Sequence, residues 1–301
     1  MRIFKAVAQW FDSQKPIQDV PVGLDWVRLL PFLGMHLACL AVFWVNVSTV
    51  AVVIALSMYA IRMFAITGFY HRYFSHRSFQ TSRIAQFIFA VLGATAVQRG
   101  PLWWAAHHRH HHAHSDQQED VHSPRQQGFW WAHMGWFLSR QHFYSDRKKV
   151  RDLEAYWELR LLDRYDLLVP ISLAVGLFFL GHWMGTAIPA SHTSGGQLLI
   201  WGFFVSTVAC YHATYTINSL AHVFGRRRFD TRDDSRNNWW LAILTFGEGW
   251  HNNHHYYPNS ARQGFLWWEI DLTYYTLKLL SYLGIVWDLK PAPVLKRNTK
   301  N

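Results

Sequence analysis

The stretch LLPFLGMHLACLAVFWVNVSTVAVVIALSMYAI, residues 29–61, contains no Asp, Glu, Lys or Arg. A second stretch without these residues runs from Leu167 to Gly225. Each stretch is too long for one membrane crossing and about right for two, because one helical crossing takes roughly 20 apolar residues. The sequence therefore predicts four transmembrane helices in two hairpins, with spans at residues 29–47, 49–69, 167–188 and 197–217.

The turns of the two predicted hairpins indicate the orientation in the membrane. They lie near Asn46–Thr49 and Pro189–Gln197, and neither contains any of the 29 Lys and Arg residues. Cytoplasmic segments collect positive charge, so we expect both termini and the middle segment in the cytoplasm. In a bacterium the protein would lie in the plasma, or inner, membrane. Near the inner end of the second span, Arg62 is expected to extend its charged head toward the cytoplasm.

The remaining sequence, residues 70–166 and 218–301, is predicted to form a cytosolic cap of helices. Residues 84–98 are apolar but too short to cross, which favours a helix at the membrane interface. We therefore expect an all-α integral membrane protein whose single domain covers residues 1–301. The net charge of +10 suits the anionic inner leaflet, an acidic partner protein or a phosphate-bearing substrate. Nucleic acid is excluded as a partner, because the basic residues are spread around the spans and no nucleic-acid module is present.

Histidines dominate the cap. The stretch HHRHHHAHSD, residues 107–116, contains the pattern H-x-x-H-H at His108, His111 and His112. On a helix these positions project from one face, so we expect them to converge on one centre. The stretch GEGWHNNHH repeats the pattern at residues 251, 254 and 255.

Two further motifs stand at the inner ends of spans. HRYFSH places His71 and His76 five residues apart after the second span. This pair needs the helix end to distort, or else it reaches the site from two sides. NSLAH places Asn218 and His222 at the end of the fourth span. The histidines of these four motifs exceed the needs of one tetrahedral metal, so we predict a pair of metals. Imidazole suits zinc, copper, iron and nickel alike.

The other histidines are assigned supporting roles. His36, His182 and His212 lie within spans, where packing or interhelical hydrogen bonding is expected. Glu248 is expected either to hydrogen-bond a ligating imidazole or to form a turn. Six histidines near the first cluster are expected to orient ligands or partners: His107, His110, His114, His122, His133 and His142.

The motifs HRYFSH, HHRHHH, NSLAH and GEGWHNNHH, in this order and with two apolar hairpins between them, resemble the membrane fatty acid desaturases of the stearoyl-CoA (acyl-CoA delta-9) type. The resemblance covers residues 29–290. It implies four spans and a cytosolic cap that holds two iron ions, with Asn218 near one of them through a water. The ligands that it implies are His71, His76, His108, His111, His112, His222, His251, His254 and His255.

The same resemblance implies the reaction. Such enzymes reduce O2 to water and remove two hydrogens from adjacent methylenes of a saturated acyl chain, which leaves a cis double bond. We expect the bond at the delta-9 position and acyl-CoA as the substrate. Ala55 and Tyr59 match positions at the end of the acyl tunnel, and Arg140 matches a basic residue that contacts the CoA phosphates.

One departure keeps other acyl carriers open. The Arg-Asp pair that precedes the second motif in animal enzymes is Ala106-His107 here, so an acyl lipid or an acyl carrier protein stays possible as substrate. A fused cytochrome b5 domain is not expected. A separate electron donor is therefore implied, and a basic cap suits an acidic ferredoxin, rubredoxin or cytochrome b5 with its reductase.

Two alternative functions use the same histidines. A lipid hydroxylase would insert oxygen at the same di-iron centre. A non-enzymatic metal-binding or transport protein would need ionisable residues along a path through the membrane, for which the spans offer only His36, His182 and His212.

Overall fold

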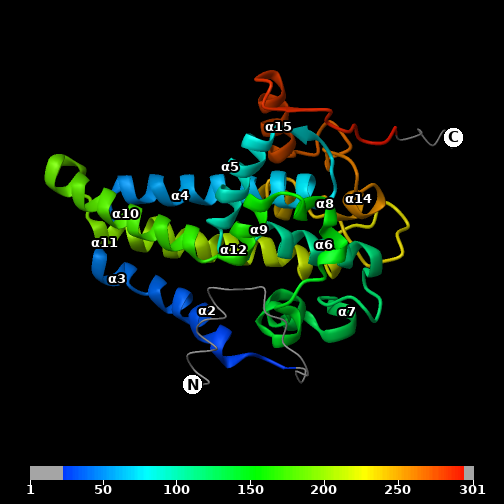
Figure 1. Ribbon diagram of the computed structural model, residues 1–301, viewed down its shortest axis with the longest axis horizontal. Coiled ribbons are helices and arrows are strands. Elements are labelled where there is room, and N and C mark those ends of the chain that lie inside the picture. The colour runs from blue at the N-terminus through cyan, green and yellow to red at the C-terminus, as the bar shows by residue number, and fades with distance from the viewer. Residues whose placement is uncertain (1–22, 295–301) are drawn as a thin grey trace.

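The computed structural model describes residues 23–294, which are mostly helical (Figure 1). Four helical stretches are long and apolar enough to cross a membrane, as judged by length and composition. They are Arg28–Val45, Thr49–Ser75, Leu168–Ala187 and Gly195–His222. The first stretch contains α2 (Trp26–Cys39) from Arg28 onward and α3 (Val42–Val45), and the second contains α4 (Thr49–Phe64) and the π-helical η1 (Ala65–Ser75). The third stretch is α10 (Leu168–Ala187). The fourth contains α11 (Gly195–Gln197), the π-helical η7 (Leu198–Val205), α12 (Ser206–Asn218) and the 3-10 turn η8 (Leu220–His222).

The loops at the far end of these helices touch one another. The Trp201 indole donates from Nε1 to the carbonyl oxygen of Asn46 at 3.0 Å, and the hydroxyls of Ser48 and Thr193 lie 3.0 Å apart. Ser48 is the N-cap of helix α4, because its hydroxyl accepts a hydrogen bond from the backbone N–H of Ala51. Both loops therefore lie at one end of the bundle, and the histidine motifs lie at the other.

Shorter elements surround the histidine-bearing end (Figure 1). The helices are α5 (Arg83–Ala94), α6 (Pro101–His114), α7 (Pro124–Gln127), α8 (Arg151–Glu154), α9 (Trp157–Arg164), α13 (Trp239–Leu244), α14 (His251–Tyr256) and α15 (Leu272–Tyr282). Single turns are η2 (Trp131–Gly135), η3 (Trp136–Leu138), η4 (Arg140–His142) and η5 (Arg147–Val150), whereas η6 (Pro189–Ser191) lies in the loop between α10 and α11 at the far end of the bundle. Strands β1 (Gln80–Thr81) and β2 (Val286–Trp287) form one short antiparallel pair, which the all-helical prediction did not include.

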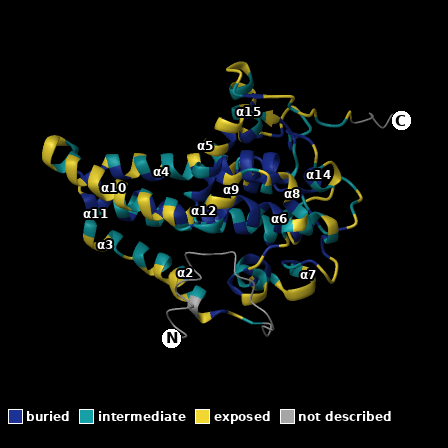
Figure 2. Ribbon diagram, viewed as in Figure 1, coloured by how far each residue is buried: buried dark blue, intermediate teal, exposed yellow. Residues whose placement is uncertain are grey.

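Burial differs between the two ends of the molecule (Figure 2). The side chains of η1 and of the first half of α6 are mostly buried, whereas α2, α3, α4 and α10 expose large apolar side chains. Phe43 is 77% exposed, Leu56 66% and Phe179 61%. Exposed apolar surface of this extent is what lipid tails would cover.

The prediction for Arg62 is wrong. Its side chain is fully buried between spans, where Nη1 donates to Ser206 Oγ at 2.6 Å and the guanidinium lies over the Phe203 ring. The reason is that η1 extends the second span by three turns beyond Arg62, so the charged head does not lie near the helix end. Arg62 therefore links α4 to η7 and α12.

The histidines within the spans fall into two kinds. His36 and His212 face each other with their Nε2 atoms 3.0 Å apart, which confirms the interhelical contact expected of them. The Nδ1 atom of His212 lies within hydrogen-bonding distance of Nε2 of His133, and His133 Nδ1 lies 2.9 Å from Ser219 Oγ. His182, by contrast, is exposed on α10.

Candidate metal centre

The π-helical segment η1 brings His71 and His76 together. An ideal α-helix would place residues five apart on different faces, but a π-helix bonds residue i to i+5. The backbone N–H of His76 donates to the carbonyl of His71, and the two imidazole centroids lie 4.9 Å apart. Of the two arrangements that the spacing allowed, the structure therefore has the distorted helix end.

Helix α6 supplies three further histidines, but they do not converge on one centre as predicted. Successive residues are rotated by about 100° on a helix. Position i+4 therefore lies about 40° to one side of position i, and position i+3 lies about 60° to the opposite side. Accordingly His108 and His112 join one cluster, and His111 joins another. Helix α14 mirrors this division, because His251 and His255 join the cluster of His111, whereas His254 joins the other.

We call the two clusters site A and site B. Site A contains His71, His76, His108, His112 and His254, and site B contains His111, His222, His251 and His255. Within each site, the potential ligand nitrogens all lie within 4.8 Å of one another. Several Nε2 atoms face each other across the site, at 3.0 Å between His71 and His254 and at 3.0 Å between His222 and His251. The nine predicted histidines thus lie in two groups that could each hold a metal ion.

Four buried carboxylates fix the orientation of four of these imidazoles. Each accepts a hydrogen bond from Nδ1, which leaves Nε2 free to act as a ligand. The pairs are His71 with Glu248 at 2.6 Å, His111 with Asp120 at 3.0 Å, His222 with Asp116 at 2.8 Å and His255 with Asp233 at 2.8 Å. Burial alone would raise the pKa of these carboxyl groups, but the bonded imidazoles outweigh it and hold each pKa below its usual value.

The sequence interpretation found only one of these four acids. Glu248 was expected either to bond an imidazole or to form a turn, and it does bond His71. Asp116, Asp120 and Asp233 were missed. Of the six histidines that were expected to orient ligands, His122 alone lies in a metal-compatible group, with His111 and Asp120. The orienting role therefore belongs mainly to carboxylates, which accept from imidazole more strongly than a neutral group does.

The other five histidines of that group contact groups outside both sites. His107 is buried against Trp103 and Trp136, and His110 bonds the Glu119 carbonyl at 2.8 Å. His114 stacks on His110, His133 bonds His212 and Ser219, and His142 bonds the Trp136 carbonyl.

The electrostatics of the sites favour neutral imidazoles. Burial, followed by neighbouring imidazoles, lowers the pKa of His76, His108, His112, His251 and His254 well below its usual value. Neutral imidazole with a free lone pair is the form that binds a metal. His111 differs, because the carboxylates of Asp120, Asp116 and Asp233 outweigh its burial and raise its pKa.

The donor set fits a metal centre without sulfur. Within residues 23–294, His255 Nε2 is buried and has no hydrogen-bond partner, while its Nδ1 is held by Asp233. An unpaired buried nitrogen costs free energy, so it needs a partner, and a cation between the imidazoles would provide one. Both cysteines, Cys39 and Cys210, lie outside the two sites.

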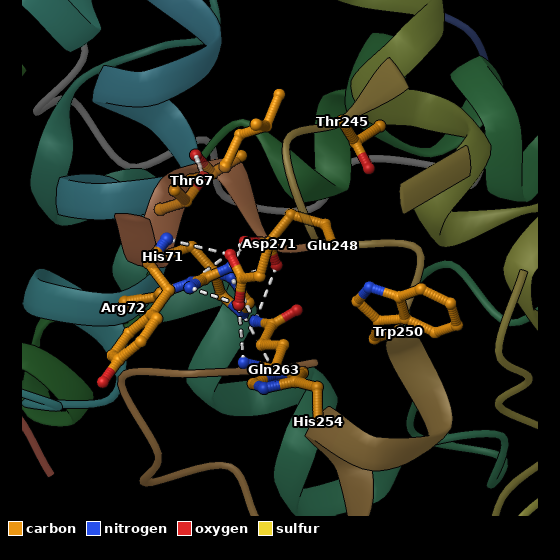
Figure 3. A network of polar contacts seen from close by, with 12 residues as sticks. Thr67, His71, Arg72, Thr245, Glu248, Trp250, His254, Gln263 and Asp271 are labelled. Carbon is orange, nitrogen blue, oxygen red and sulfur yellow. Dashed lines mark hydrogen bonds and ion pairs between the residues drawn. The ribbon is translucent and has the colours of Figure 1, made fainter. Parts of the chain in front are cut away.

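A buried network of ion pairs and hydrogen bonds holds Glu248, the carboxylate that bonds His71 of site A (Figure 3). Arg72, next to His71 on η1, lies 3.0 Å from Glu248 Oε1 and 2.9 Å from Asp271 Oδ1, and its Nη1 donates to the Ala261 carbonyl. Gln263 donates to the other oxygen of Glu248 at 2.8 Å. The carboxylate that holds His71 is thus itself held by an arginine and an amide. The network joins η1 to the segments before α14 and α15.

The remaining predicted site residues lie outside the two clusters. Asn218 ends α12, four residues before His222, and its role through a water stays a prediction. Ala55 and Tyr59 lie one turn apart on α4, and the Tyr59 hydroxyl donates to the Leu244 carbonyl at 2.6 Å. Arg140 is half exposed, with Nε 3.6 Å from Asp25 Oδ1.

Replacing Asp233 with asparagine is expected to weaken metal binding at site B by about 10- to 100-fold, the usual cost of losing an outer partner of a ligating histidine. The measurement is metal content after titration with a chelator. The neighbouring Asp234→Asn is the matched control, because the Asp234 carboxylate makes ion pairs of 3.6–3.7 Å with Arg125 and Arg227, whereas its bond to Asp116 comes from the backbone N–H and does not depend on the side chain. Equal chelator sensitivity of the two variants would contradict the assigned role of Asp233.

Comparisons with known proteins agree with this architecture. Residues 26–283 match the family model described as fatty acid desaturase. An sn-1 stearoyl-lipid 9-desaturase of Anabaena variabilis is 39% identical over 272 residues, which are 89% of this chain and 95% of that protein. An sn-1 stearoyl-lipid 9-desaturase of Synechocystis sp. is 39% identical over 274 residues, 89% and 81% of the two chains. An acyl-CoA 5-desaturase of Anemone leveillei is 36% identical over 299 residues, 95% and 88% of the two chains.

Proposed function

Because the chain belongs to the fatty acid desaturase family, we propose that it uses O2 and two iron ions to introduce a cis double bond at the delta-9 position of a saturated acyl chain. The observation that carries this proposal is the division of nine histidines into two adjacent groups of five and four. Two groups of this kind suit two metal ions, and a pair of irons suits the oxidation of an unactivated chain.

The proposal assigns a role to each part of the site. The histidines of sites A and B hold the irons, and Asn218 contributes through a water. When bound there, the irons supply an oxidant strong enough to remove hydrogen from a methylene. The chain loses two hydrogens, the electron donor gives two electrons, and O2 leaves as two waters with two further protons. Glu248, Asp116, Asp120 and Asp233 keep the imidazoles in place throughout.

The surroundings keep the site dry. All nine histidines are buried or half-buried, and the Trp104 ring stacks on His108 with centroids 5.0 Å apart. A dry site strengthens electrostatic contacts and prevents reactive oxygen species from escaping into water. The aromatic cover therefore supports oxidative chemistry on an apolar chain.

We further propose that one domain over residues 1–301 spans the membrane four times, with its histidine sites and both termini in the cytoplasm. This topology is supported by the absence of Lys and Arg from the two contacting loops at the far end of the bundle. Electrons then come from a separate acidic protein, such as a ferredoxin, a rubredoxin or cytochrome b5 with its reductase. The net charge of +10 suits such a partner.

Two observations favour an acyl lipid over acyl-CoA as the molecule that carries the acyl chain. Two of the relatives above are named as lipid desaturases, although the third is named for acyl-CoA. In addition, Ala106-His107 offers little to a CoA phosphate, because the His107 ring is packed against Trp103 and Trp136.

Expression in a host that lacks unsaturated fatty acids tests the proposed function. We expect unsaturated lipids whose double bond maps to the delta-9 position by mass spectrometry, and purified protein with close to two irons per chain. A gain of oxygen in the lipid would instead identify a hydroxylase. Unchanged lipids would favour a metal-binding or transport protein, and iron-free enzyme that still desaturates would refute the di-iron centre.

Tyr59 is expected to set the preferred chain length. Tyr59→Ala removes a ring that packs on Phe246, with centroids 6.2 Å apart, and should lengthen the space for the chain end. We expect the ratio of desaturated stearoyl to palmitoyl product to rise at least about tenfold, the lower end of the discrimination that one methylene gives in an apolar pocket. Tyr59→Phe keeps the ring and serves as control. An unchanged ratio in Tyr59→Ala would place the tunnel end elsewhere.

A further inference from the structure

A pocket of about 1030 Å³ opens beside site B. Its wall includes Val223, which follows His222, and Trp250, which precedes His251. The wall is tied to the histidine segment through backbone hydrogen bonds, since Asn238 N–H donates to the Gly249 carbonyl at 2.7 Å. Two residues of the pocket wall are therefore direct sequence neighbours of site B histidines.

The pocket is strongly basic. Four arginines line it, at positions 226, 227, 228 and 236, and no Asp or Glu does. Two of them are already engaged, because Arg228 pairs with the buried Glu269, and Arg227 lies 3.7 Å from Asp234 and 3.8 Å from Asp230.

The other two arginines, Arg226 and Arg236, have N–H donors that are free to bind a ligand. Arg226 is exposed and has no side-chain partner among the described residues. Arg236 makes one long bond of 3.4 Å to the Gly225 carbonyl, and its buried Nε has no partner. Two guanidinium groups that line one pocket and pair with no acid among the described residues suit a phosphate group, whose oxygens they can bind through their N–H donors.

Four tryptophans and Phe224 also line the pocket, which lies where the fourth span ends. Trp239 is 65% exposed and Trp268 49%, and both line the pocket with Trp240 and Trp250. The pocket begins directly after the span residue His222. Helix α13, which carries Trp239, is bonded at its end to Tyr59 of the second span. Tryptophan prefers the membrane–water interface, so the pocket lies at headgroup depth.

From this combination we infer that the pocket binds the phosphate-bearing headgroup of a glycerolipid that enters sideways from the bilayer. The inference rests on the proposed function and names its substrate class: an anionic diacyl lipid whose acyl chain is desaturated in place. Arg226 and Arg236 bind the phosphate, and the tryptophans contact the glycerol and upper acyl carbons. An acidic protein partner fits less well, because Arg227 and Arg228 already pair with the chain's own acids and the basic surface is concave and aromatic.

Lipid binding by metal-free protein tests this inference independently of catalysis. The probes are fluorescent phosphatidylglycerol and, in detergent micelles of the same kind, fluorescent diacylglycerol, which carries no phosphate. We expect wild type to prefer phosphatidylglycerol by about tenfold, the scale of one charge-assisted contact. Arg226→Ala should lose this preference, and Arg226→Lys should keep part of it. Arg160→Ala is the matched control, because Arg160 is exposed on α9 and bonds only the Glu154 carbonyl.

Desaturation assays with iron-loaded protein separate the possible outcomes. Wild type should desaturate stearoyl phosphatidylglycerol, and Arg226→Ala should raise the KM for this lipid with little change in kcat. Equal binding of the two lipids, or turnover of stearoyl-CoA alone, would overturn the headgroup site. A raised KM for the reduced electron donor with unchanged lipid binding would also overturn it and assign the pocket to the donor. Failure of the proposed function would look different, because wild type would then desaturate no acyl substrate at all.

Discussion

Alanine in place of His111 is expected to reduce iron binding and desaturation by more than about a hundredfold, beyond the cost of losing an outer partner alone. His111 contributes to site B and is held by the buried Asp120. Its removal leaves that site with three histidines and leaves Asp120 without its strongest partner. Iron content by plasma emission spectroscopy and product yield by gas chromatography measure the two effects.

His110→Ala is the control, one residue away on the same helix. His110 points to the Glu119 carbonyl and to Lys149, and it belongs to neither site. We expect it to keep the metal content and most of the activity of the wild type. Equal losses in the two variants would mean that the dense histidine cluster acts as a whole, and the division into sites A and B would then be wrong.

The second large effect is expected at Arg72. Arg72→Met keeps most of the side-chain volume but leaves Glu248 and Asp271 as buried carboxylates without their cation. Breaking a buried ion pair in this way costs about 3–5 kcal/mol. The midpoint of heat unfolding in detergent should fall markedly, and iron should be lost from site A, because Glu248 also holds His71.

Arg77→Met is the matched control for this substitution. Arg77 lies five residues further along and pairs with Asp152, but both side chains are about one-third exposed or more. An ion pair of this kind contributes only about 0–1 kcal/mol, so the unfolding midpoint should hardly move. Similar midpoints for the Arg72 and Arg77 variants would show that the buried network contributes little to stability.

Much of the fold follows from the sequence because long uncharged runs have few alternatives to membrane-spanning helices. The run that begins at Leu29 predicts its spans well, but hydropathy alone misplaces the inner ends. The second helix continues to Ser75 and the fourth helical stretch to His222, because other segments bury these polar turns. Arg62 was misplaced for the same reason, since its burial depends on Ser206 from a distant span.

The candidate site was predictable in its histidines but not in its acids. The repeated H-x-x-H-H pattern singles out both sets of imidazoles, whereas Asp116 and Asp233 resemble ordinary acidic residues of loops. Asp116 lies 106 residues before its partner His222, so no local spacing connects them. The division of each motif between two sites was also hidden, because it depends on how α6 and α14 face each other.

That division has a consequence for how the sequence can change. Helices α6 and α14 each supply ligands to both sites. One inserted residue between His108 and His111 would rotate the following residues by about 100°. His111 and His112 would then leave their separate sites together. Neither site can be altered alone through these helices, so insertions and deletions should be excluded from both while remaining tolerable in the loops at the far end of the bundle.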